Sequence, residues 1–254
     1  MRVLVTRPEP QASEWTHALS LRGLDALALP LLAIVRPQDP AAVARAWTAL
    51  GQLDGVMFVS PSAAQAWIDA RPANHAWPAR VWVAAPGPGT ARSLAALGAE
   101  HTLVPPADAE QFDSDALWSA ISHRDWRGRR ILIVHGGGGR DELAQRWRAA
   151  GAVVDKLEAY RRDDAPWSAA QQAAFDAAVS DPAAHVWLFS SGDAIGRLER
   201  RAAHVQWHAH RALCTHPAIA ERARRAGFAN VHECRPEIDA VAAAIRDCMR
   251  AAAS

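Results

Sequence analysis

The stretch RVLVT at residues 2–6 decides the fold, because it returns as RILIV at residues 130–134, an offset of 128. MFVS at residues 57–60 likewise returns as LFSS at residues 188–191, an offset of 131. Each stretch is a short apolar run of the kind that forms a buried strand. A chain that repeats such strands in the same order is predicted to fold as two similar halves, and α/β halves of this kind commonly form a ligand cleft between them.

Short apolar runs alternate with helical patterns along the whole chain. Residues 10–22 and 140–150 have the apolar spacing of helices, and each pattern ends at a glycine, Gly23 or Gly151. Alternating strands and helices predict parallel sheets covered by helices on both faces. The fold class is therefore α/β, with two flavodoxin-like parallel-sheet domains. The predicted strands are 3–5, 25–29, 55–59, 81–85, 101–104, 131–134, 153–158, 185–189, 211–214 and 230–233.

Two polar, proline-marked segments predict where the chain passes from one domain to the other. They are residues 36–40 (RPQDP) and 161–166 (RRDDAP). If both segments are crossings, residues 38–162 form one domain, and residues 1–35 together with 167–254 form the other. Ordinary loops have the same composition, so that reading stays open.

Composition excludes several classes of protein. The 254 residues carry a formal net charge of +1, which provides no basic surface for DNA or RNA. No apolar run approaches the ~20 residues that span a membrane, and the first residues lack the apolar length of a secretory signal. Three cysteines without paired spacing are typical of reduced thiols. We therefore expect a soluble, cytoplasmic protein, and a monomer.

Polar turns rich in Gly, Ser and Thr follow the predicted strands. Ligands of parallel α/β sheets bind at these carboxyl ends, and backbone N–H groups at the following helix N-termini favour anions. Ser and Thr also cap helices without any ligand, so a single turn has two explanations. Their recurrence in both halves favours binding. The candidate substrate-binding residues are Arg7, Ser60, Ser62, Gly87, Thr90, Gly138, Arg140, Ser190, Ser191 and Gly192.

Familiar cofactor motifs are incomplete in this chain. The run Gly136–Arg140 lacks the Lys-Ser/Thr ending of a phosphate-binding loop, and Arg92 stands where a dinucleotide fingerprint starting at Gly87 needs its third glycine. The histidines near Cys214 have no familiar zinc spacing. We therefore expect no nucleotide, no metal and no other cofactor.

Tyr160 is the only tyrosine, and it follows the predicted strand at the second candidate crossing. A phenol at that place could donate a proton or a hydrogen bond to a bound ligand. A purely packing role explains the residue equally well. It is nevertheless the candidate catalytic residue.

Several short motifs, taken in order, resemble the uroporphyrinogen-III synthase family over essentially the whole chain. The sequence departs from the family pattern at Val59, Ser62 and His135, where Thr, Asn and Arg are usual. The motifs are VTRP at 5–8, FVSPSA at 58–63, GPGTA at 87–91, DSDAL at 113–117, residues 131–140, GAV at 151–153 and YRR at 160–162.

The resemblance implies two α/β domains joined by a two-stranded linker. It also implies cofactor-free cyclisation of the linear tetrapyrrole hydroxymethylbilane, with inversion of ring D. Tyr160 matches the family tyrosine proposed to assist loss of the substrate hydroxyl, and Ser60, Thr90 and Ser190 match positions expected to bind substrate. The alternative is a non-catalytic two-lobed binding or sensor module, for which the same turns are equally suitable.

Overall fold

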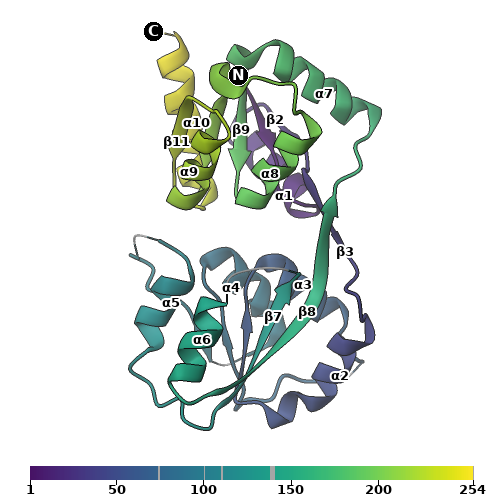
Figure 1. Cartoon of the computed structure of the whole chain (residues 1–254), viewed down its shortest axis with the longest axis vertical. Coiled ribbons are helices and arrows are strands. Elements are labelled where there is room, and N and C mark those ends of the chain that lie inside the picture. Colours follow the sequence, from purple (N-terminus) through teal and green to yellow (C-terminus); the bar gives the residue numbers. More distant parts are fainter. Residues whose placement is uncertain (74, 100, 110, 138–140, 254) are drawn as a thin grey trace. The chain divides into compact units, whose positions relative to one another are not determined.

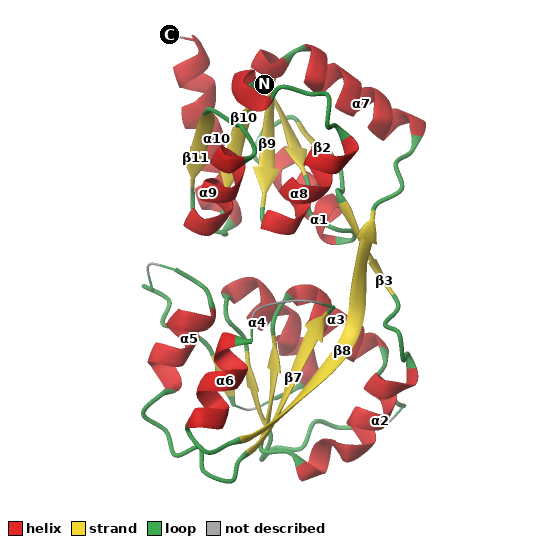
Figure 2. Cartoon of the chain, viewed as in Figure 1, coloured by secondary structure: helices red, strands yellow, loops and turns green. Residues whose placement is uncertain are grey.

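The computed structural model describes residues 1–73, 75–99, 101–109, 111–137 and 141–253. The chain divides into two compact units, residues 1–33 with 163–254 (unit 1) and residues 34–162 (unit 2). Each unit contains a β-sheet with helices on it (Figures 1 and 2). The expectation of an α/β chain with two parallel-sheet domains is confirmed.

Unit 1 contains a five-stranded sheet with the order β11-β10-β9-β1-β2, and the pairings between its neighbours are all parallel. In chain order within the unit this is 2-1-3-4-5 read from β2, the flavodoxin-like arrangement. The strands are β1 (Arg2–Val5), β2 (Ala26–Ala28), β9 (His185–Phe189), β10 (Arg211–Cys214) and β11 (Asn230–Glu233), and the helices are α1 (Gln11–Ser20), α7 (Ala169–Ser180), α8 (Gly192–Arg201), α9 (Pro217–Arg225) and α10 (Ile238–Ala253).

The two faces of this sheet are buried by different kinds of side chain. On one face, Val3, Val5 and Leu188 pack against apolar residues of α1 and α10. Trp187 is also fully buried, and it meets Trp207 edge-on with ring centroids 5.6 Å apart. Alternate residues of each strand thus enter opposite cores, as a sheet covered on both faces requires.

Unit 2 contains the second sheet, with the order β3-β8-β7-β4-β5-β6. Among its described pairings, β8-β7-β4-β5-β6 are parallel. The strands are β3 (Leu32–Val35), β4 (Gly55–Phe58), β5 (Trp82–Ala84), β6 (Thr102–Leu103), β7 (Arg130–Gly136) and β8 (Val153–Asp164), and the helices are α2 (Ala41–Ala49), α3 (Pro61–Asp69), α4 (Pro88–Leu94), α5 (Ser114–Ile121) and α6 (Glu142–Ala149). Short 3₁₀ turns lie at 50–52, 95–97, 182–184 and 207–209.

The chain passes between the units inside two paired strands, β3 and β8. The sequence pattern predicts no strand at 32–35, and it ends the later strand at residue 158, whereas β8 continues to Asp164. The polar residues Arg161–Asp164 are part of a strand because β3 pairs with β8, a tertiary contact that overrides their loop-like composition.

The strand register reproduces the sequence repeat residue by residue. Val3 lies opposite Val186 in unit 1. The repeat partner of Val3 is Ile131, at offset 128, and the repeat partner of Val186 is Gly55, at offset 131. Ile131 and Gly55 lie opposite each other in unit 2. Each sheet therefore combines the first two strands of one sequence repeat with the last three strands of the other. Helices α4 and α9 begin at Pro88 and Pro217, so these two prolines hold equivalent positions in the two repeats.

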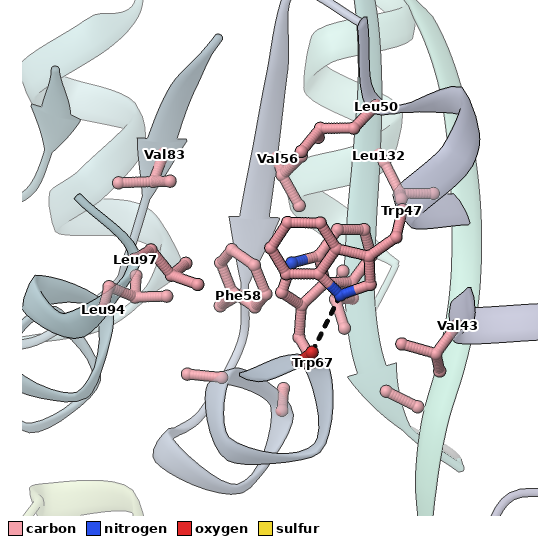
Figure 3. Close-up of a cluster of buried hydrophobic side chains, with 14 of the residues drawn as sticks. Val43, Trp47, Leu50, Val56, Phe58, Trp67, Val83, Leu94, Leu97 and Leu132 are labelled. Carbon is pink, nitrogen blue, oxygen red and sulfur yellow. Dashed lines mark hydrogen bonds between the residues drawn. The ribbon is translucent and has the colours of Figure 1, made fainter. Parts of the chain in front are cut away.

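Tryptophans fill the core on one face of the unit 2 sheet (Figure 3). Trp47 and Trp67 lie with ring centroids 5.0 Å apart, and the indole N–H of Trp47 donates to the carbonyl of Trp67 at 2.9 Å. Trp147 is fully buried on the opposite face with residues of α5 and α6. Truncating a buried Trp to Ala typically costs about 3–5 kcal/mol, so these rings are major contributors to stability.

Asp54 joins the starts of β4 and β7. Its carboxylate accepts from the backbone N–H of Arg130 and from the guanidinium of Arg129, both at 2.8 Å. Burial opposes ionisation of Asp54, but these hydrogen bonds and the positive charge of Arg129 outweigh it, and the pKa of the carboxyl is lowered. The ionised side chain therefore stabilises the folded state above the unfolded pKa, about 3.9, and that contribution is lost as the pH falls through the folded value.

We predict that Asp54→Asn lowers the free energy of unfolding at pH 7 by about 1 kcal/mol, because hydrogen bonds to an ionised group are lost. The difference from the unsubstituted protein should shrink at a pH below about 3, where the carboxyl takes up a proton. Urea unfolding at the two pH values measures both quantities, with the exposed Asp108→Asn as control. A difference that stays constant with pH would contradict this assignment.

Candidate functional site

The candidate site in unit 2 is built on the hydroxyl of Tyr160. The side chain is 2% exposed and belongs to the apolar core on the α3 face of the sheet. Its phenolic oxygen lies 3.0 Å from Ser60 Oγ and accepts a hydrogen bond from Arg162 Nη2 at 3.1 Å. A buried aromatic residue is thus tied to Ser60, which follows β4, and to Arg162 of β8, beside the carboxyl ends of β4 and β7 where ligands of parallel sheets bind.

An irregularity in the pairing of β7 with β8 sets the direction of Tyr160. His135 lies opposite Glu158, but the next residue, Gly136, lies opposite Tyr160. Leu157 faces the α3 side, so regular alternation would turn Tyr160 to the other face of the sheet. The extra residue in β8 returns it to the α3 side, which is how a β-bulge redirects a side chain.

Gly136 provides the space that the phenol ring occupies. A Cβ at this position would lie 2.2 Å from Tyr160 Cζ, far inside van der Waals contact. The next residue, Gly137, donates its backbone N–H to the carbonyl of Tyr160 at 3.1 Å. Any side chain at residue 136 would therefore displace the ring or the strand.

Ser60 is held by its role as the N-cap of α3. Its hydroxyl oxygen accepts from the backbone N–H of Ala63 at 3.2 Å, as an N-cap side chain does. The residue at the matching offset in unit 1, Ser191, caps α8 in the same way through Asp193. However, Tyr160 is the only tyrosine in the chain, so the cap in unit 1 has no tyrosine beside it. Both repeats therefore share the cap, and only unit 2 adds the phenol.

A polar pocket of about 400 Å³ lies next to this network in unit 2. It is lined by Gln38, Gly137, Glu158, Arg161 and Arg162. One carboxylate faces two guanidinium groups, so the pocket favours an anionic ligand, and guanidinium groups match carboxylates well. Tyr160 also lines a second, more apolar pocket of about 490 Å³ near α2 and α3.

The remaining predicted residues of unit 2 lie in the same set of turns. Ser62 is the second residue of α3, Gly87 is the N-cap of α4, and Thr90 is the third residue of α4 with 4% exposure. Gly138 and Arg140 lie outside the described residues. Helices α3 and α4 thus begin directly after β4 and β5, which is where helix N-termini bind anions.

The predicted residues of unit 1 gather at the carboxyl ends of β1 and β9. Arg7 places its guanidinium 4.0 Å from the centre of the Trp15 ring. Ser191 and Gly192 form the start of α8. The hydroxyl of Ser190 is buried and has no hydrogen-bond partner among the described residues, so it can bind a group that the chain does not supply.

Sequence reasoning did not single out Gly136, Arg161 or Arg162 as functional residues. The position of the two arginines directly after the only tyrosine was a usable signal. The sequence alone does not show that residue 136 must be glycine, because that requirement comes from the ring of Tyr160 on the neighbouring strand β8.

Two other kinds of chemistry find little support in the described part of the chain. No group of three or more His, Cys, Asp or Glu side chains among those residues is arranged to hold a metal ion. Burial raises the pKa of Cys214 and of Cys234 to about 12. Neither thiol is therefore a thiolate nucleophile at neutral pH.

Comparison with known proteins links these features to one family. The family model for uroporphyrinogen-III synthase HemD matches residues 13–243. Uroporphyrinogen-III synthase from Proteus mirabilis is 29% identical over 165 residues, which cover 64% of this chain and 80% of that protein. The Escherichia coli K12 enzyme of that name is 29% identical over 174 residues, covering 68% and 70%.

Solved structures show the same fold at lower identity. A mutant uroporphyrinogen III synthase from Thermus thermophilus matches with a TM-score of 0.62 and 15% identity, covering 98% of this chain and 99% of that one. Uroporphyrinogen-III synthetase from Helicobacter pylori 26695 matches with a TM-score of 0.55 and 13% identity, at the same coverage. Among the described residues, no helix is long and apolar enough to cross a membrane.

We predict that Gly136→Ala displaces the Tyr160 ring, because the added methyl group would occupy its place. The single tyrosine signal in the NMR spectrum of protein labelled with ¹³C at tyrosine should shift, and the melting temperature should fall. Gly51→Ala, where a Cβ would meet nothing within 4 Å, is the matched control and should change neither. An unmoved tyrosine signal in Gly136→Ala would disprove the packing argument.

Proposed function

The chain belongs to the uroporphyrinogen-III synthase family, and we propose that it is a lyase that cyclises hydroxymethylbilane to uroporphyrinogen III with inversion of ring D. The observation that carries the proposal is the buried phenol of Tyr160, held between Ser60 and Arg162 at the carboxyl end of the unit 2 sheet. A hydroxyl network there suits a reaction that begins with loss of a substrate hydroxyl.

The chemistry needs little from the protein besides position and one proton. Loss of the ring A hydroxyl leaves a cation that the pyrrole nitrogen stabilises as an azafulvene. The substituted carbon of ring D attacks it to form a spiro intermediate, which fragments and closes again with ring D inverted. Closure without inversion occurs spontaneously, so the enzyme must hold the tetrapyrrole in the geometry that gives the other product.

The turns beyond the strands account for recognition of the substrate. Hydroxymethylbilane carries eight carboxylates, and helix N-termini bind such groups through backbone N–H donors. In this proposal Ser60, Ser62, Gly87 and Thr90 of unit 2 bind substrate. The residues that do so in unit 1 are Arg7, Ser190, Ser191 and Gly192. Gly138 and Arg140 are proposed with them from the sequence alone.

We also propose that the protein acts as a cytoplasmic monomer and needs no cofactor. Sedimentation of the purified chain should then give a mass near 27.4 kDa. A stable dimer would contradict the first part of this proposal.

The product isomer tests the proposed function directly. Hydroxymethylbilane is incubated with the purified protein, and the products are oxidised and separated by isomer. We expect predominantly the type III isomer, because the protein prevents direct closure. If only the type I isomer forms, as in buffer, the proposal fails, and a binding or sensor module becomes the better reading.

We predict that Tyr160→Phe lowers kcat about tenfold and leaves KM nearly unchanged, because the phenol assists a chemical step while the carboxylates are bound elsewhere. The fold should persist, since the ring still fills its place beside Gly136. Steady-state kinetics with type III product as the readout measures both constants. An unchanged kcat would show that the hydroxyl is dispensable.

A further inference from the structure

The hydrogen bonds around Tyr160 have a definite direction. The Arg162 guanidinium has only donors, so the phenolic oxygen must accept from it. The phenol's own proton then needs an acceptor, because a buried donor without one is costly. Among the described residues, Ser60 Oγ at 3.0 Å is the acceptor within reach. The phenol therefore donates to Ser60.

The same accounting applies to Ser60. Its oxygen has two acceptor positions, and it accepts from the Ala63 N–H at 3.2 Å and from the Tyr160 hydroxyl. Both positions are then occupied, and the serine's own proton is left to be donated outside the network. Ser60 is partly exposed, whereas Tyr160 is 2% exposed.

We propose that Ser60, and not Tyr160, is the residue that contacts the substrate and gives the proton to its leaving hydroxyl. Tyr160 and Arg162 are positioning residues that orient Ser60 and resupply its proton. This inference rests on the proposed function and specifies which hydroxyl of the network acts.

The proton transfer balances without any added reagent. As the bond between the ring A methylene carbon and oxygen breaks, its electron pair stays on oxygen, which takes the Ser60 proton and leaves as water. The pyrrole nitrogen supplies the electron pair that forms the azafulvene. Ser60 takes the phenol proton, and Arg162 stabilises the resulting anionic oxygen on Tyr160. The proton that ring D loses after closure returns through Ser60 to Tyr160.

The sequence repeat supports a role for Ser60 beyond capping. Ser191 caps α8 in unit 1, and the chain has no second tyrosine to accompany it. A helix cap alone therefore needs neither the phenol nor the space that Gly136 provides. The phenol and the space for it occur only beside Ser60, whose hydroxyl must be oriented to donate its proton in this proposal.

A double-mutant cycle tests the proposal. We compare kcat for type III product in the unsubstituted enzyme, Tyr160→Phe, Ser60→Gly and the double variant. Glycine is chosen because it replaces a serine N-cap at a cost of only a few tenths of a kcal/mol. We expect Ser60→Gly to lower kcat about 100-fold. In that background Tyr160→Phe should change kcat less than about twofold, because a residue that acts through Ser60 couples to it.

Two controls accompany the cycle. Ser168→Gly removes the serine cap of α7, whose hydrogen bonds are made with Gln171 and not with the network, and should leave kcat unchanged. Ser60→Thr keeps a hydroxyl and should retain most of the activity and its sensitivity to Tyr160→Phe.

The outcomes distinguish the proposed function from the role of Ser60. If the unsubstituted protein makes no type III isomer, the proposed function fails. If it does, and Tyr160→Phe lowers kcat by the same factor in the Ser60→Gly background as in the unsubstituted enzyme, the phenol acts directly and the inference is overturned. Activity that survives Ser60→Gly but disappears in Tyr160→Phe also overturns it. Activity that disappears in Ser60→Gly but persists in Ser60→Thr and Tyr160→Phe supports it.

Discussion

The parallel pairing of β7 with β4 is the interaction on which the candidate site depends. It joins strands from the two sequence repeats, with Val134 opposite Phe58, and so brings the end of β7 beside the turn that contains Ser60. Because β8 pairs with β7 on the other side, Tyr160 arrives at the same edge of the sheet. Residues 100 positions apart in the sequence thus form one hydrogen bond.

The two repeats have kept the same register but carry different chemistry. Val3 with Val186 and Ile131 with Gly55 are equivalent pairs, so the backbone frames of the two sheets correspond. Unit 2 departs from that frame at the bulge beside Gly136, where the ring of Tyr160 occupies the space that a side chain at residue 136 would take. Local irregularities of this kind are common next to active sites, where they direct a side chain that regular alternation would misplace.

Much of the fold follows from patterns within single segments. Short apolar runs between helical stretches predicted ten strands that the structure contains, because buried parallel strands need continuous apolar residues. Strand β3 was missed because its formation depends on β8. Tyr160 stands out in the sequence as the only tyrosine, but its face of the sheet was not predictable, since one inserted residue reverses it. The position of Arg162 after the tyrosine is visible in the sequence, but its hydrogen bond to the phenol at 3.1 Å is not, because it depends on how β8 folds.

We propose above all that the tetrapyrrole binds at the Tyr160 network, and the single tyrosine allows a direct measurement of that binding. Protein labelled with ¹³C at tyrosine is titrated with uroporphyrinogen III, the product, and its one tyrosine NMR signal is followed. We expect a saturable shift in the unsubstituted protein and a much smaller shift in Ser60→Gly at saturating product. A tyrosine signal that stays in place while the product binds would show that the tetrapyrrole lies elsewhere.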